Sequence, residues 1–217
     1  MTVIRGFLAI LFFLLTILSG PVFGGESVSF TWAFFLKPKV GQVKSMAFDT
    51  PEMVEGGELL RIYLELHKRS FLYVYLFDAR KDLYLVFPAS GSFYNGDVPV
   101  GYKTYIPSGR EWFSLDNLKG TERFYLLAST KRLIELEKMT DRFLATADQT
   151  LKLKLLKMIE KIAGDFSGTP EYEVDPVPVH QGEWLNTSAF PPPRVSAHKV
   201  KATGNYGMIL DMINNGK

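Results

Sequence analysis

Hydrophobic and polar positions alternate along several short segments of the chain, and this pattern predicts β-strands. Leu59–Leu66 places four apolar side chains on one face of an extended chain, which predicts a strand with one buried face. Phe71–Phe77 and Leu83–Phe87 are apolar on both faces, as in strands that lie inside a sheet with something packed on each side. The residues DARKD between them predict a hairpin turn with a solvated tip. Pro88 ends the second strand because proline cannot donate to the ladder.

Shorter alternating runs, separated by turns rich in Gly, Pro, Ser and Asn, predict further strands. These runs are residues 27–36, 102–106, 111–115, 123–128 and 194–203. Many short strands separated by turns are typical of a sandwich or a barrel.

The pattern changes at residues 129–163, which contain neither proline nor glycine. Apolar residues recur four apart from Phe143 to Ile159, which predicts one amphipathic helix over residues 130–163. Thr140 is a candidate N-cap, and Gly164 is a candidate C-terminal stop. The proline-rich residues 164–193 are expected to be irregular and to wrap the domain.

We therefore predict a mainly β, α+β fold: an antiparallel β-sandwich of about seven strands with one long packed helix. Four parts are expected along the chain. They are a signal peptide at 1–24, an N-terminal strand and linker at 25–57, a sandwich domain at 58–203 that includes helix 130–163, and a tail at 204–217.

The N-terminal residues predict export. Arg5 precedes an uncharged apolar run at residues 6–18, and a Gly-Pro pair and small residues follow, so cleavage is expected after Gly24. The run is shorter than the roughly 20 residues that a bilayer span needs. An uncleaved anchor and a buried core helix are the alternatives. The predicted location is the periplasm or the extracellular space.

Composition narrows the class further. The chain holds 47% hydrophobic and 22% charged residues, as globular proteins do. Because it has no cysteine, disulfides, thiol catalysis and thioether-linked haem are excluded, and burial alone must hold an exported domain together. Its 25 basic residues nearly balance its 23 acidic residues, which argues against a nucleic-acid partner.

Residues that could support chemistry are scattered through the sequence, and no motif joins them. The candidates are the histidines His67, His180 and His198, the serines Ser90, Ser92 and Ser108, the turn acids Asp78 and Asp82, and the acids Glu171, Glu173 and Asp175. A catalytic zinc needs about three convergent ligands, and a nucleophilic serine needs a base and an orienting group. No catalytic, cofactor-binding or metal-binding residue is therefore assigned, and no cofactor is expected.

The order of strands and turns from Gly56 to Ser129 resembles bacterial domain-of-unknown-function family 4384. The similar features are the strand LLRIYLEL, the hairpin FLYVYLFDARKDLYLVFP, the turn YIPSG at 105–109 and the strand ERFYLLAS at 122–129. The resemblance implies an exported or envelope protein. The family's role is not established, and it supplies no catalytic residues.

The expected function is that of a non-enzymatic binding or assembly module of the cell envelope, with an envelope or periplasmic protein as partner. The aromatic residues, 14% of the chain, are expected to build the core, although tyrosines on strands can also form a sugar- or peptide-binding platform. The alternative function is a cell-wall-directed hydrolase that uses carboxylates. Membrane attachment is expected only if the signal segment stays uncleaved.

Overall fold

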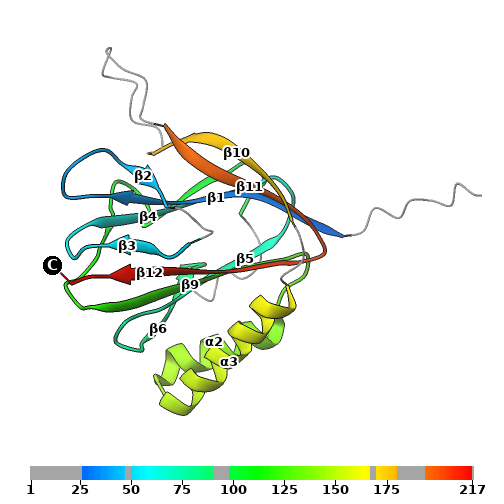
Figure 1. Ribbon diagram of the computed structural model, residues 1–217. Coiled ribbons are helices and arrows are strands. Elements are labelled where there is room, and N and C mark those ends of the chain that lie inside the picture. Colours follow the sequence, from blue (N-terminus) through cyan, green and yellow to red (C-terminus); the bar gives the residue numbers. More distant parts are fainter. Residues whose placement is uncertain (1–25, 47–49, 90–97, 167–169, 180–193, 217) are drawn as a thin grey trace, which may run out of the picture.

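The computed structural model describes residues 26–46, 50–89, 98–166, 170–179 and 194–216. In these ranges two β-sheets pack face to face, and two helices lie against the outside of one sheet (Figure 1). The predicted antiparallel β-sandwich of the α+β class is confirmed. The predicted signal peptide at 1–24 lies outside the described residues.

The first sheet has the order β10-β11-β1-β4-β7, with β2 beside β1 and β8 beside β4. The second sheet has the order β3-β12-β9-β5-β6. All described pairs are antiparallel except β3 with β12. The bounds are β1 Ser27–Lys37, β2 Lys44–Ser45, β3 Glu52–Val54, β4 Leu59–Leu66, β5 Phe71–Phe77, β6 Leu83–Phe87, β7 Lys103–Ile106, β8 Phe113–Ser114, β9 Gly120–Ser129, β10 Glu171–Pro178, β11 Arg194–Thr203 and β12 Tyr206–Asn214.

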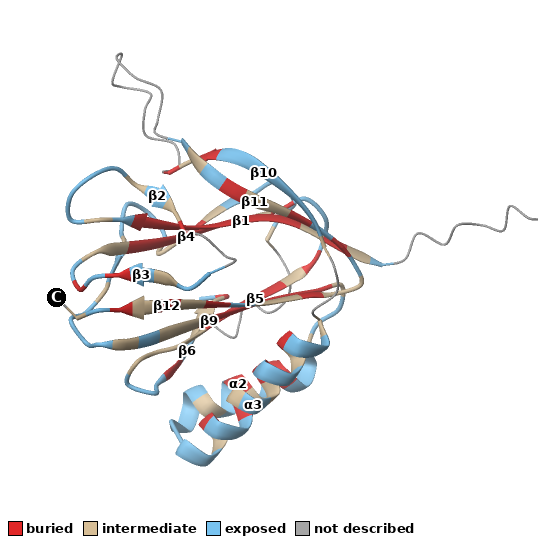
Figure 2. Ribbon diagram, viewed as in Figure 1, coloured by how far each residue is buried: buried red, intermediate tan, exposed pale blue. Residues whose placement is uncertain are grey.

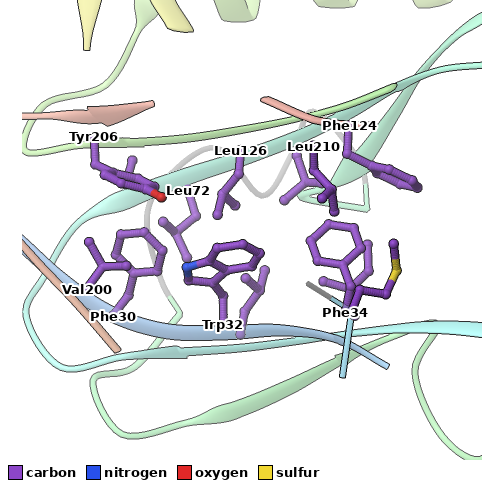
Figure 3. Close-up of a cluster of buried hydrophobic side chains, with 14 of the residues drawn as sticks. Phe30, Trp32, Phe34, Leu72, Phe124, Leu126, Val200, Tyr206 and Leu210 are labelled. Atoms are coloured by element: carbon purple, nitrogen blue, oxygen red, sulfur yellow. The ribbon is translucent and has the colours of Figure 1, made fainter. Parts of the chain in front are cut away.

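The main core lies between the two sheets, as the alternation of apolar residues predicts. One face of β1 and one face of β4 turn toward it, and β5, β9 and β12 close it from the other side. Figure 3 shows Trp32 at its centre, with Phe30 and Phe34 on either side of it along β1. The ring centroids of Phe34 and Phe124 lie 4.9 Å apart across the core. The large apolar area removed from water here is the main source of stability.

The predicted single buried face of β4 is wrong, because both faces are covered. Arg61 and Tyr63, on the outward face, are fully buried. Tyr63 belongs to a second cluster outside the first sheet, and Arg61 lies over the Tyr105 ring of that cluster. β11 pairs with β1 only as far as His198, while its earlier residues continue alongside β10. This two-stranded ribbon curls over the sheet and brings Val177 and Val195 onto Tyr63 and its neighbours. A local alternation pattern cannot anticipate cover that comes from residues more than a hundred positions away.

The predicted single helix is also wrong, because two helices form: α2 (Ile134–Thr146) and α3 (Gln149–Asp165). Ala147 takes a left-handed conformation with φ of 49°, and the carboxylate of Asp148 accepts a hydrogen bond from the Leu151 amide at 2.8 Å. Asp148 is thus the N-cap of α3, and a short polar side chain of this kind favours a new helix start.

The two predicted helix boundaries are also wrong. Thr140 is buried within α2, where its hydroxyl donates to the Leu136 carbonyl at 2.8 Å. Gly164 lies inside the last turn of α3, which continues to Asp165. The sequence pattern identified the helical region but not the break in it.

The helical hairpin packs on the outer face of the second sheet and keeps its own outer face in solvent (Figure 2). Three tyrosines of that sheet are buried beneath it and each hydrogen-bonds a polar side chain of a helix. The pairs are Tyr73 to Glu137 at 2.6 Å, Tyr75 to Thr140 at 2.9 Å and Tyr125 to Glu160 at 3.2 Å. Because a buried hydroxyl needs a partner, these bonds select one position of the hairpin on the sheet.

Residues 204–217, predicted as a tail, contain the strand β12 instead. β12 lies between β3 and β9, and Tyr206, Leu210 and Met212 point into the main core. The segment is apolar on both faces and short, so it shows no clean alternation, and pairing with β9 over nine residues decides its conformation.

Gly207 lets α3 approach β12. A Cβ atom there would lie 2.6 Å from the Ala163 carbonyl oxygen and 2.9 Å from the Ala163 Cα. We expect Gly207→Ala to lower the free energy of unfolding by about 1–3 kcal/mol, since helix and strand must move apart. The matched control is Gly164→Ala, where a Cβ meets nothing within 4 Å and removal of a helical glycine should stabilise by about 0.5–1 kcal/mol. Urea unfolding of both variants measures this, and equal effects would contradict the argument.

Candidate functional site

The strand β10 forms an exposed edge of the first sheet in the described chain. Within the described ranges β10 pairs with β11 on one side only, so its other side presents unpaired backbone groups. All six positions from 171 to 176 are exposed, as the pale blue colour of β10 in Figure 2 shows. Residues 171–175 are called the β10 edge below. A free strand edge is a template for the backbone of another chain.

The two faces of the β10 edge differ in chemistry. Tyr172 and Val174 lie opposite Val200 and His198 of β11, so they extend the inner, apolar face of the sheet. Their exposed fractions, 54% and 60%, are large for apolar side chains within a strand. The acidic residues at 171, 173 and 175 alternate with them and point to the outer face. The edge therefore offers an apolar side and an anionic side.

The anionic side belongs to a row of polar residues that crosses the whole first sheet. Directly paired positions share a face, and this row comprises Glu173, Lys199, Thr31, Glu65 and Lys103. Lys199 donates a hydrogen bond to Glu173 at 2.7 Å. This bond lowers the pKa of Glu173 and raises the pKa of Lys199, so both are charged at neutral pH. An acid and a base pair on each side of the neutral Thr31, and the row ends in an acid at the β10 edge.

Beside the edge, four rings contact one another in a cluster from the main core outward: Trp32, His198, Tyr206 and the exposed Tyr172. The ring centroids of Trp32 and His198 lie 5.5 Å apart, and the hydroxyls of Tyr172 and Tyr206 lie 3.2 Å apart. Tyr206 is buried, and burial raises the pKa of its hydroxyl. Tyr172 is thus held by its ring and hydroxyl contacts even though more than half of it is exposed.

His198 makes the stability of this cluster depend on pH. Burial lowers its pKa below the ordinary value of 6.5. Well above pH 6.5, His198 is neutral in both the folded and the unfolded chain. Below pH 6.5 the unfolded chain takes up a proton more readily than the folded chain, so the free energy of unfolding falls as the pH approaches the lowered pKa of the folded state. We expect the free energy of unfolding of the wild type to fall more between pH 7.5 and 5.5 than that of His198→Gln. Urea unfolding at both pH values measures the difference, and identical losses would contradict it.

The described candidate histidines identified from the sequence lie at different places in the fold. His67 lies at the end of β4, where its Nε2 is 2.6 Å from the Thr31 hydroxyl, and His198 lies in the ring cluster. His180 and the serines Ser90 and Ser92 fall outside the described residues. In the described ranges no group of three His, Asp or Glu side chains could hold a metal ion.

The turn acids have structural roles. Asp78 accepts a hydrogen bond from the Asp82 amide at 2.8 Å, which closes the turn between β5 and β6. Asp82 lies 3.2 Å from the Lys152 ammonium of α3. Glu171, Glu173 and Asp175 are brought together on one face of β10. The predicted solvated tip of the hairpin is exposed from residue 80 to 82, and the Lys81 carbonyl in it accepts a hydrogen bond from Lys152 of α3 at 2.7 Å.

Sequence reasoning missed Tyr172 and Val174 because residues 164–193 were expected to be irregular. The alternation EYEVD was present at 171–175, but Pro176 and Pro178 obscured it. Proline is tolerated on a strand edge, where no neighbour needs its missing N–H, so prolines beside such alternation favour an edge strand.

Over the described residues, fold and surface together define an antiparallel β-sandwich with a helical hairpin and an exposed edge at β10. Residues 54–132 match the family model described as a domain of unknown function (DUF4384), which confirms the resemblance found in the sequence. No curated protein and no solved structure matches the chain. The match covers β4 to β9, so the β10 edge lies outside it.

Neither α2 nor α3 has the length and apolar character needed to cross a bilayer. These are the two helices of the described part of the chain.

Proposed function

We propose that this protein is an exported bacterial envelope protein that acts as a non-enzymatic binding or assembly module, with the β10 edge as its contact surface. The observation that supports this most directly is the pair of exposed apolar residues on an open strand. Proteins protect free edges with charge, proline or short length. The β10 edge has acids and is followed by prolines, yet Tyr172 and Val174 are exposed between the acids and work against that protection. Their exposure is explained if another chain covers them.

The rest of the molecule supports a rigid platform for binding. Tyr63, Tyr73, Tyr75 and Tyr125 are buried in the outer clusters of the two sheets, so most strand aromatics are occupied in packing. A rigid sandwich loses little conformational entropy when a segment adds to its edge, because the edge strand is already ordered.

Export is supported by residues 1–24, whose charge and apolar run are typical of a signal peptide. Intact-mass measurement on protein recovered from the periplasm or medium tests this. The expected mass corresponds to a chain that begins at residue 25, and the full-length mass would instead indicate an anchor.

Capture from an envelope extract tests the binding role. The bait is the tagged, exported chain, compared with the double variant Tyr172→Ser, Val174→Ser. Deletion of residues 165–217 is unsuitable, because it would remove β10, β11 and β12 together. We expect a specific envelope protein with the wild type and at least tenfold less of it with the variant. Failure of the wild type to retain any protein would refute the proposal.

The alternative function, a cell-wall-directed hydrolase, remains a prediction and requires a different arrangement of side chains. A glycosidase needs two carboxyls in different environments, about 5 to 9.5 Å apart across a substrate. On β10, Glu173 is bound by Lys199 in the open. Release of soluble fragments from purified cell wall, abolished by Glu173→Gln, would favour the hydrolase over the binding module.

A further inference from the structure

We propose that the occupant of the β10 edge is an extended segment of another protein in which basic residues alternate with apolar ones. This inference rests on the proposed function and specifies the chemistry of its partner. It follows from three features of the edge: the order of charges across the sheet, the exposed apolar pair, and the arrangement that a second copy would require.

The charge order defines one face of the partner strand. An added strand would place its side chains directly opposite Glu171, Glu173 and Asp175 on the outer face. On β11, the neighbouring strand, Lys201 and Lys199 already lie directly opposite Glu171 and Glu173 on this outer face. Basic residues on the added strand would continue the alternation of acid and base to one further strand, whereas acidic residues there would oppose like charges.

The apolar pair defines the other face. The side chains alternate along any added strand, so the positions between the basic residues fall beside Tyr172 and Val174. Both are more than half exposed, and apolar side chains placed there would remove their surface from water. Tyr172 is already oriented by its contact with the Tyr206 hydroxyl, so little side-chain freedom would be lost.

A second copy of this chain fits the edge poorly. Two β10 strands related by a two-fold axis would pair antiparallel, with the outer face of each on the same side of a continuous sheet. Acidic residues of one copy would then lie directly opposite acidic residues of the other, which destabilises a strand pair. Pro176 and Pro178 limit the contact at the far end, since neither can donate a backbone hydrogen bond. The edge therefore suits a short basic segment from a different protein.

The test mixes the exported chain with a fluorescently labelled seven-residue peptide that alternates lysine and valine. Fluorescence anisotropy of the peptide measures binding. Two control peptides have glutamate in place of lysine, or the same lysines and valines grouped in two blocks. We expect binding of the alternating basic peptide and at least tenfold weaker binding of both controls. Hydrogen exchange should show protection of residues 171–175 only with the alternating peptide, as strand addition requires.

Matched variants locate the contact. The double variant Glu171→Gln, Glu173→Gln is expected to weaken binding about fivefold or more, while Glu135→Gln on the exposed side of α2 should leave it unchanged. Thermal unfolding confirms that the variants are folded. Equal binding of the block peptide, unchanged binding by the double variant, or a dimer of the wild type that Val174→Ser dissolves would each overturn the inference.

Failure of the proposed basic partner strand can be distinguished from failure of the proposed binding function. If the envelope protein captured by the wild type is still captured by the Glu171→Gln, Glu173→Gln variant, the basic strand is wrong and the binding role stands. If the wild type captures nothing, the proposed function itself fails.

Discussion

Replacing Leu210 with alanine is expected to lower the free energy of unfolding by about 3 kcal/mol, enough to unfold a substantial fraction of a marginally stable domain. Leu210 lies on β12, is only 2% exposed, and points into the main core opposite Phe34 and Trp32 (Figure 3). Truncation leaves a cavity that close-packed neighbours fill only in part. Urea unfolding followed by circular dichroism measures the change.

The control for this prediction is the adjacent residue. Ile209 points to the other face of β12 and is 44% exposed, so Ile209→Ala should cost less than about 1 kcal/mol. The two substitutions remove the same number of carbon atoms from neighbouring positions. If both cost the same, β12 does not contribute a buried face and the C-terminal residues would be the tail that their sequence suggests.

The position of β12 also bears on the family match. Residues 54–132 supply β4 to β9, yet the strands between β11 and β4 in one sheet and between β3 and β9 in the other are β1 and β12, both outside the match. The main core takes Phe30, Trp32 and Phe34 from β1. In this chain the matched residues therefore form part of one sandwich whose core is completed from both ends of the sequence.

Predictability from the sequence followed the strength of the local pattern. β4 and β11 have the predicted bounds, and β5 and β6 flank the predicted turn, because alternation and turn residues specify them locally. The turn at Ala147 and Asp148 was missed because an apolar stripe continues across it and a single capping carboxylate decides the break. β10 and β12 were missed because their conformation depends on pairing with distant strands.

The candidate surface was less predictable than the fold. The three acids on β10 were noticed as a charged cluster, but which face they share, and that Tyr172 and Val174 lie exposed between them, follows only from the edge position of the strand. The burial of Arg61 was also unexpected. It donates to the Gly109 carbonyl and lies 4.8 Å from the ring centroid of Tyr105. Burial by residues that are distant in the sequence leaves no local pattern around Arg61 that could predict it.

Replacing Glu137 with alanine is the second large effect, expected to cost about 3 kcal/mol and to loosen the helical hairpin. Its carboxylate is 3% exposed, accepts from the Tyr73 hydroxyl at 2.6 Å, and accepts from Arg132 Nε at 3.0 Å. Burial, together with the bond to Glu137, raises the pKa of Tyr73, so its hydroxyl remains a donor and would lose this acceptor beneath the helices.

Glu135, two residues away in the same first turn of α2, provides the control for this substitution. Its carboxylate is 79% exposed and lies 3.1 Å from Lys138, so Glu135→Ala removes one exposed ion pair that is worth less than about 1 kcal/mol. Urea unfolding gives the two costs, and hydrogen exchange of α2 shows whether the hairpin opens before the sandwich. A similar cost for both variants would mean that the tyrosine contacts do not fix the hairpin, and that apolar packing alone positions it.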